Sequence, residues 1–196
     1  MAAELARLFA APDPLPALAA MRGAGVLAAV LPEGGDFTLL RGLIGVDGAD
    51  PDPWRRLMAL VGGDVKVVEA MARRLRLSRR LSARLVAIAR PRPPVTPETA
   101  KKDLYRLGRE RFTDLAFLAW AAMPTAATFE AAIARAGQWQ PPRLPLTGDD
   151  IKALGVAEGA RIGEILAALE DWWVDNDFPA DEGPIREKLR QLVPGR

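Results

Sequence analysis

The sequence predicts an all-α protein, an array of short helices. Alanine and leucine dominate the 196 residues, runs of β-branched residues are scarce, and apolar residues recur every three or four positions rather than every two. Prolines and glycines interrupt this pattern repeatedly, which keeps the predicted helices short. The longest apolar stretches, such as 25–31 and 115–123, fall far short of the ~20 residues needed to cross a bilayer, so no membrane helix is expected.

Five helices are predicted in the first 60 residues. Pro12 and Pro14 end the first of them, and Gly23 and Gly25 interrupt the chain after the second. Pro53 is well placed as the first residue of the fifth, since that position needs no backbone N–H. The predicted ranges are 2–10, 15–22, 26–31, 37–44 and 53–60.

The middle of the chain carries helix-capping residues. Asp64 is expected to cap a helix through Leu75, and Ser78 to cap the next one, through Ile88. The prolines at 91–94 then form a stiff linker, which we take as the main internal boundary. Beyond it the Thr-Pro-Glu sequence at 96–98 predicts a helix start and Gly108 its stop. Further helices are predicted up to Met123 and from Pro124 to Gly137.

A second proline-rich linker, 140–145, precedes the last helices. Thr147 is expected to cap a helix that Gly155 ends, and helices are predicted at 162–173 and from Pro184 to Leu192. Trp172 and Trp173 are adjacent, so on a helix they point about 100° apart and cannot both face one core. These boundaries divide the chain into the segments 1–90, 95–138 and 144–196.

The composition excludes several kinds of catalytic centre. The chain has no cysteine and no histidine, which removes thiol nucleophiles, thiolate metal sites, the usual general base and every Ser-His or Cys-His pair. A chain without cysteine is typical of a reducing cytoplasm, where we place the protein. No glycine-rich phosphate loop with its Lys and Ser/Thr is present. We therefore predict no catalytic residue and no metal ligand in this chain.

The acidic residues have structural interpretations. Asp50 and Asp52, one residue apart, are the nearest approach to a two-metal nucleotidyl-transfer site, but the prolines around them favour a turn or a helix cap. Asp149 and Asp150 follow a capping threonine, where a helix dipole stabilises negative charge without a metal ion. The acidic group at 170–177 lacks the spacing of a calcium loop, which favours a solvated helix end.

The basic residues are concentrated in one segment. Residues 64–111 hold fourteen Lys or Arg against five Asp or Glu, whereas residues 144–183 hold two against ten. Of the 27 basic residues 22 are arginines, whose planar fork suits phosphate groups. Such a surface binds nucleic-acid backbones by releasing counterions. The alternative is a solvated helix face, the usual role of a run of charges.

If residues 71–84 form consecutive helical turns, the spacing of Arg73, Arg76, Arg80 and Arg84 brings them to one side as a basic stripe. We expect the double substitution of Arg76 and Arg80 by Glu to abolish binding of a nucleic-acid backbone. The residues predicted to bind it are Arg73, Arg74, Arg76, Arg79, Arg80, Arg84, Lys101, Lys102, Arg106, Arg109 and Arg111.

Several motifs resemble one family. They are, in chain order, Gly25-Val26-Leu27 with Leu31-Pro32-Glu33, then Leu75-Arg76-Leu77-Ser78, then 145–155 (PLTGDDIKALG) and 158–166 (EGARIGEIL). Together they resemble the C-terminal region of bacterial CCA-adding tRNA nucleotidyltransferases and the related poly(A) polymerases. The chain departs from the family at Gly159-Ala160, where the family usually has Gly-Pro.

The resemblance implies a fold equivalent to the neck, body and tail of class II tRNA nucleotidyltransferases, without the mixed-sheet head. Residues 1–90 would be neck- and body-like, 95–138 body-like and 144–196 tail-like. In the family the head holds the metal-binding aspartates and the nucleotide. It would precede Met1, because Ala3-Glu4-Leu5 resembles the residues just after the family's Glu-Arg pair. Magnesium and nucleotide are therefore expected in the head, with no cofactor in this chain.

The resemblance also implies a function. This region would bind tRNA or another RNA and position its 3′ end for nucleotide addition by a head domain, in cis or in trans. The chain alone is expected to be inactive, so it should not incorporate labelled ATP. The alternative is a helical protein-interaction scaffold with no role in RNA binding.

Overall fold

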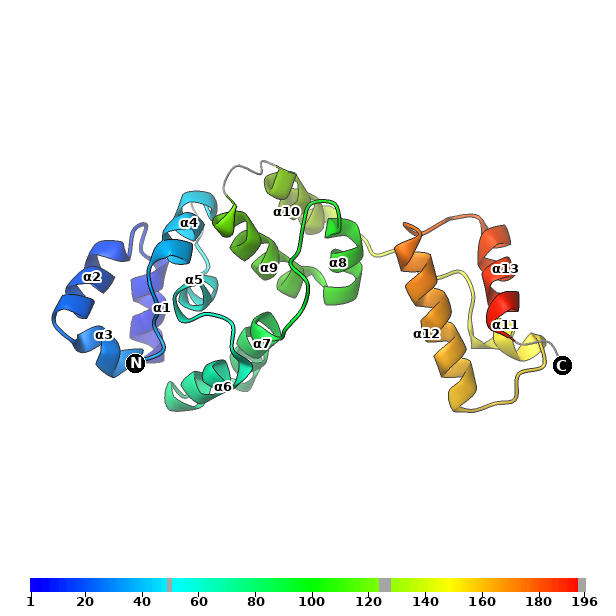
Figure 1. The fold of residues 1–196 in the computed structure, drawn as a ribbon, viewed down its shortest axis with the longest axis horizontal. Coiled ribbons are helices and arrows are strands. Elements are labelled where there is room, and N and C mark those ends of the chain that lie inside the picture. Colours follow the sequence, from blue (N-terminus) through cyan, green and yellow to red (C-terminus); the bar gives the residue numbers. More distant parts are fainter. Residues whose placement is uncertain (49–50, 124–127, 194–196) are drawn as a thin grey trace. The chain divides into compact units, whose positions relative to one another are not determined.

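The computed structural model describes residues 1–48, 51–123 and 128–193 and contains thirteen α-helices and no strand within these ranges (Figure 1). The all-α prediction is confirmed. The chain forms two compact units, residues 1–138 and 139–196. None of the described helices is long and apolar enough to cross a membrane.

Unit 1 contains the helices up to residue 138. They are α1 (Ala2–Ala10), α2 (Leu15–Gly23), α3 (Val26–Val30), α4 (Thr38–Val46), α5 (Pro53–Val61), α6 (Val65–Arg74), α7 (Arg79–Ala89), α8 (Ala100–Leu107), α9 (Arg109–Ala122) and α10 (Thr128–Gln138). Each predicted helix of this region has a counterpart. The predicted start of the last one, at Pro124, lies outside the described residues.

Side-chain caps fix where the central helices begin. The Asp52 carboxylate accepts hydrogen bonds from the backbone N–H groups of Trp54 (3.0 Å) and Arg55 (2.8 Å), at the start of α5. Asp64 caps α6 in the same way, and Ser78 Oγ accepts from the backbone at the start of α7. The capping roles predicted for Asp64 and Ser78 are confirmed, as is the cap interpretation of Asp52. Asp50 lies outside the described residues.

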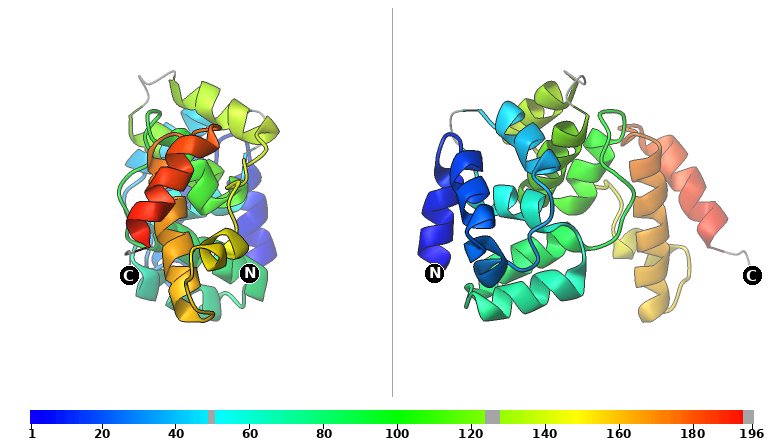
Figure 2. Two further views of the ribbon diagram at one scale, coloured as in Figure 1. Left: turned by 90° about the vertical axis from the view of Figure 1, so that its right-hand side faces the viewer. Right: turned by 60° about the vertical axis from the view of Figure 1, so that its left-hand side comes forward.

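The core of unit 1 is built around α4, α5 and α9, which pack on one another (Figure 2). Where α4 crosses α9 the backbones approach very closely. A Cβ atom added to Gly42 would lie 2.2 Å from the carbonyl oxygen of Ala121. Because α9 also packs on α7, the proline linker 91–94 lies inside unit 1, and the division between the units falls at 138/139.

A buried ion pair joins three helices of this core. The Arg56 side chain is 1% exposed and binds both carboxylate oxygens of Asp47, at 2.6 and 2.9 Å. Its Nη1 also donates to the backbone carbonyls of Phe9 (3.0 Å) and Ala11 (2.6 Å). The guanidinium thus holds the end of α1 and the end of α4 against α5, with both charges paired and hydrogen-bonded as burial requires.

Unit 2 contains α11 (Gly148–Ala153), α12 (Ala160–Asp175) and α13 (Glu182–Leu192). The Asp150 carboxylate accepts a hydrogen bond from the backbone N–H of Thr147 at 2.8 Å, so the cap interpretation of Asp150 is confirmed. Trp173 is buried, and its Nε1 donates to the carbonyl of Pro179 at 2.9 Å, whereas Trp172 is half-buried. Only one of the two tryptophans therefore belongs to the core.

Candidate nucleic-acid interface

The turn between α6 and α7 carries an arginine in an unusual conformation. The N–H of Leu77 donates to the carbonyl of Ala72 (3.0 Å) and the N–H of Arg76 to that of Arg73 (3.1 Å), the bonding pattern of a Schellman motif. Arg76 has φ +54°, at the position that glycine usually occupies. A side chain in this left-handed region costs roughly 1–2 kcal/mol. The turn also separates α6 from α7, so the arginines between 73 and 84 do not lie along one helix.

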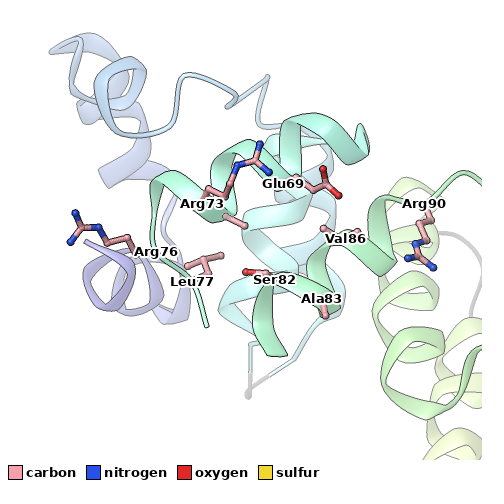
Figure 3. A pocket seen from close by; sticks show the side chains of 9 residues that line it. Glu69, Arg73, Arg76, Leu77, Ser82, Ala83, Val86 and Arg90 are labelled. Atoms are coloured by element: carbon pink, nitrogen blue, oxygen red, sulfur yellow. The ribbon is translucent and has the colours of Figure 1, made fainter. Parts of the chain in front are cut away.

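A hollow of about 630 Å³ lies between α6 and α7 (Figure 3). We call it the α6–α7 hollow. Arginines 73, 76 and 90 line it and are all exposed, and no ion pair involves them within the described part of the chain. Figure 3 shows the side chains of Arg76 and Arg90 at opposite ends. The complete lining is Glu69, Ala72, Arg73, Arg76, Leu77, Ser82, Ala83, Val86 and Arg90, with one acidic residue among three arginines.

Arg84, a predicted member of the basic stripe, has a structural role instead. Its guanidinium binds Asp114 of α9 through Nε (2.8 Å) and Nη2 (2.7 Å), and Nη2 also lies 2.7 Å from Asp52. The hydrogen bonds with Asp114 raise the pKa of Arg84 further above its usual value, against the effect of burial. Arg55 binds the same carboxylate at 3.1 Å. Because its charge is used inside unit 1, we leave Arg84 out of the proposed interface.

The neighbouring predicted arginines differ in how far they are neutralised. Arg74 donates to the carbonyl of Val30 at 2.6 Å and forms an ion pair with Glu33. The Arg80 side chain is 90% exposed, and its distance of 3.8 Å from Glu110 makes a weak, solvent-screened pair. Arg79 is exposed at the start of α7. Arg80 and Arg79 are therefore available to a ligand, whereas Arg74 is largely occupied.

The predicted basic group across the linker lies on α8 and α9. Lys101 and Lys102 are half-buried on α8, and Arg106 is exposed near its end. Arg109, the first residue of α9, is exposed. Arg111, two residues further along α9, is half-buried, and its Nε is buried without a hydrogen-bond partner in the described structure.

Two further arginines belong with this group, although they were missing from the predicted set. Arg90 follows the end of α7, and Arg92 lies in the proline linker, where its Nη2 pairs with Asp103. Arg92 Nη1 is buried without a hydrogen-bond partner in the residues that the structure describes. Burial lowers the pKa of Arg111, and the positive charges of Arg92 and Arg90 lower it further. The Arg-Pro-Arg sequence at 90–92, within the basic segment 64–111, is the signal that could have identified these residues.

The described residues contain no group of three or more acidic side chains placed to hold a metal ion.

Comparison with known proteins gives one local similarity. No family model matches the chain. A stretch of 54 residues is 33% identical to the CCA tRNA nucleotidyltransferase 1, mitochondrial, of Danio rerio. The match covers 28% of this chain and 12% of that protein. The similarity therefore concerns a small part of the relative. That relative is a CCA tRNA nucleotidyltransferase, and the motifs of this sequence resemble the same family.

Proposed function

We propose that unit 1 binds RNA through its phosphate groups, as the tRNA-binding region of a CCA-adding or poly(A)-adding nucleotidyltransferase. It would position the RNA 3′ end for nucleotide addition by a head domain located elsewhere. The observation that carries the proposal is a set of exposed arginines: Arg73 and Arg76, which line the α6–α7 hollow, Arg79 at the start of α7 and Arg109 at the start of α9. No acidic side chain of the described residues forms an ion pair with any of them.

The physical argument concerns charge and counterions. An exposed arginine without an ionic partner has its full charge available, and its planar fork can donate two parallel hydrogen bonds to a phosphate. Each phosphate that is neutralised releases condensed cations, so the logarithm of the binding constant falls by roughly 0.7–0.9 per contact for each tenfold rise in salt. Such binding depends on the charge and shape of the RNA more than on its sequence. The local similarity to a tRNA-modifying enzyme favours tRNA as the RNA.

The protein-interaction scaffold has less support. The large hydrophobic residues that are exposed in the described structure are Met1, Val26, Met123 and Leu154. They are four residues in a chain of 196, whereas a docking site for a protein usually presents a contiguous patch of several exposed apolar side chains.

The test is tRNA binding by the full chain, measured as fluorescence anisotropy over a range of potassium chloride concentrations. The double variant R73Q/R76Q removes two charges. Glutamine at position 76 still places a side chain on a residue in the left-handed conformation, as arginine does, so the backbone strain is unchanged. We expect its affinity for tRNA to fall about tenfold at low salt. The slope of the logarithm of the binding constant against the logarithm of salt concentration should decrease by the contribution of about two phosphate contacts.

The matched control is R41Q. Arg41 is an exposed arginine of the same unit on α4, and this helix lies apart from α6 and α7 in Figure 1. It should bind tRNA within about twofold of the unmodified protein, since a surface charge outside the interface contributes little. Binding that does not depend on salt, or an equal loss in R41Q and R73Q/R76Q, would reject the proposed interface.

A further inference from the structure

Three arginines of unit 1 lie close enough for their charges to interact, and one of them, Arg90, lines the α6–α7 hollow. Arg90 follows the last residue of α7, Arg92 lies in the linker, and Arg111 lies in the first turn of α9. Their charges influence one another, because Arg92 and Arg90 both disfavour the protonated form of Arg111. We call these three residues the arginine cluster. Like charges repel, so the fold holds together groups that would separate in solution.

The cluster is incompletely neutralised. Its one ion pair in the described structure is between Arg92 and Asp103, and the Asp103 carboxylate also accepts a hydrogen bond from Thr99 Oγ1 at 2.6 Å. Arg90 and Arg111 have no acidic partner among the described residues. Two of the three positive charges therefore have no acidic partner within the described residues.

Two hydrogen-bond donors of the cluster are also unused. Arg92 Nη1 and Arg111 Nε are buried and have no acceptor within the described part of the chain. A buried donor without a partner costs roughly 1–3 kcal/mol, and few such groups occur in folded proteins. A water molecule could accept these hydrogen bonds, but it would leave the excess positive charge in place.

A tetrahedral oxyanion would meet both needs at once. It carries negative charge and several acceptor oxygens, which suit the donor geometry of guanidinium groups. We infer that Arg90, Arg92 and Arg111 bind one phosphate group. Resting on the proposed function, we take this group to be a phosphodiester of the bound RNA. Arg90 connects the two sites, since it also lines the α6–α7 hollow, at the end opposite Arg76 (Figure 3).

The first arm of the test uses inorganic phosphate and no RNA. Thermal unfolding of the full chain is compared in potassium phosphate and in potassium chloride of equal ionic strength, for the unmodified protein and for R90Q, R111Q and R41Q. Phosphate also stabilises proteins in a general way, and R41Q reports that contribution. We expect phosphate to raise the Tm of the unmodified protein and of R41Q by about 2–4 °C more than that of R90Q or R111Q.

R90Q keeps the test valid if R111Q folds poorly, because Arg90 is exposed and outside the helices. An equal response to phosphate in all four proteins would overturn the inference. It would leave the proposed function standing if tRNA binding still depended on Arg73 and Arg76.

The second arm uses tRNA and identifies the source of the phosphate group. If the group belongs to RNA, R90Q and R111Q should each weaken tRNA binding about three- to tenfold, and inorganic phosphate should compete with tRNA. If the phosphate effect on Tm is selective but tRNA binding is unchanged in both variants, the cluster binds a free phosphate, which overturns the assignment to RNA. Failure of tRNA binding altogether, with the selective phosphate effect retained, would reject the proposed function and keep the site.

Discussion

Replacing Arg76 by glycine should make the protein more stable and worse at binding RNA. Arg76 occupies the left-handed position of the turn after α6, with φ +54°. Glycine removes a backbone penalty of roughly 1–2 kcal/mol at such a position but gains roughly 0.5–1 kcal/mol of entropy in the unfolded chain. The net stabilisation is about 0.5–1 kcal/mol, which corresponds to a rise in Tm of about 1–4 °C for a protein of this size.

Two measurements on the same variant separate the two effects. Circular dichroism follows thermal unfolding, and anisotropy follows tRNA binding, which should weaken by about three- to fivefold for the loss of one phosphate contact. Arg76→Gln is the matched control, since it removes the charge and keeps a side chain in the left-handed conformation. It should lose RNA affinity without gaining stability. Unchanged tRNA affinity in Arg76→Gly, or a lower Tm, would refute the assignment of a binding role to a strained arginine.

Three further predictions test the packing and the electrostatics of unit 1. Gly42→Ala should destabilise the protein by about 2–4 kcal/mol in urea unfolding, because its Cβ would meet a backbone carbonyl at 2.2 Å; Gly45→Ala, on the same helix with open space around it, should be neutral or stabilising. Arg56→Met should cost about 3–5 kcal/mol by leaving Asp47 buried and unpaired, and restoration of stability by a second change, Asp47→Leu, would show that the unpaired charge is the cause. Burial opposes ionisation of Asp52, but its hydrogen bonds from the α5 backbone and from an arginine outweigh burial and lower its pKa. The ionised Asp52 carboxylate therefore stabilises the fold fully above its unfolded pKa, near 4, and this stabilisation is lost as the pH falls through its lower pKa in the folded protein. Asp52→Asn should accordingly flatten the dependence of the free energy of unfolding on pH between about 5 and 2.

The helices could be predicted from the sequence because their limits are set by local chemistry. Asp64 and Ser78 act as caps through hydrogen bonds to the backbone two or three positions away, and such hydrogen bonds can form in any chain with the same local sequence. The same holds for Asp52, whose neighbouring prolines marked it as a cap. The left-handed turn at Arg76 escaped prediction, because the expected signal for such a turn is a glycine.

The basic surface could be predicted only in part. The segment 64–111 was identified from its charge, but which arginines face solvent depends on partners distant in sequence. Arg84 meets Asp114 thirty residues later, and Arg56 meets backbone carbonyls 45 and 47 residues earlier. No local pattern distinguishes these paired arginines from Arg73 or Arg76, because the distinction arises when helices pack.

The carboxylate of Asp114 has a consequence for the integrity of unit 1. It is held by Arg55 of α5 and by Arg84 of α7, and it belongs to α9, on the far side of the exposed linker prolines. A single proteolytic nick in that linker would thus sever the chain but leave charge pairs and helix packing across the cut. The nicked protein should elute from a sizing column as one particle, and its two fragments should come apart only in denaturant.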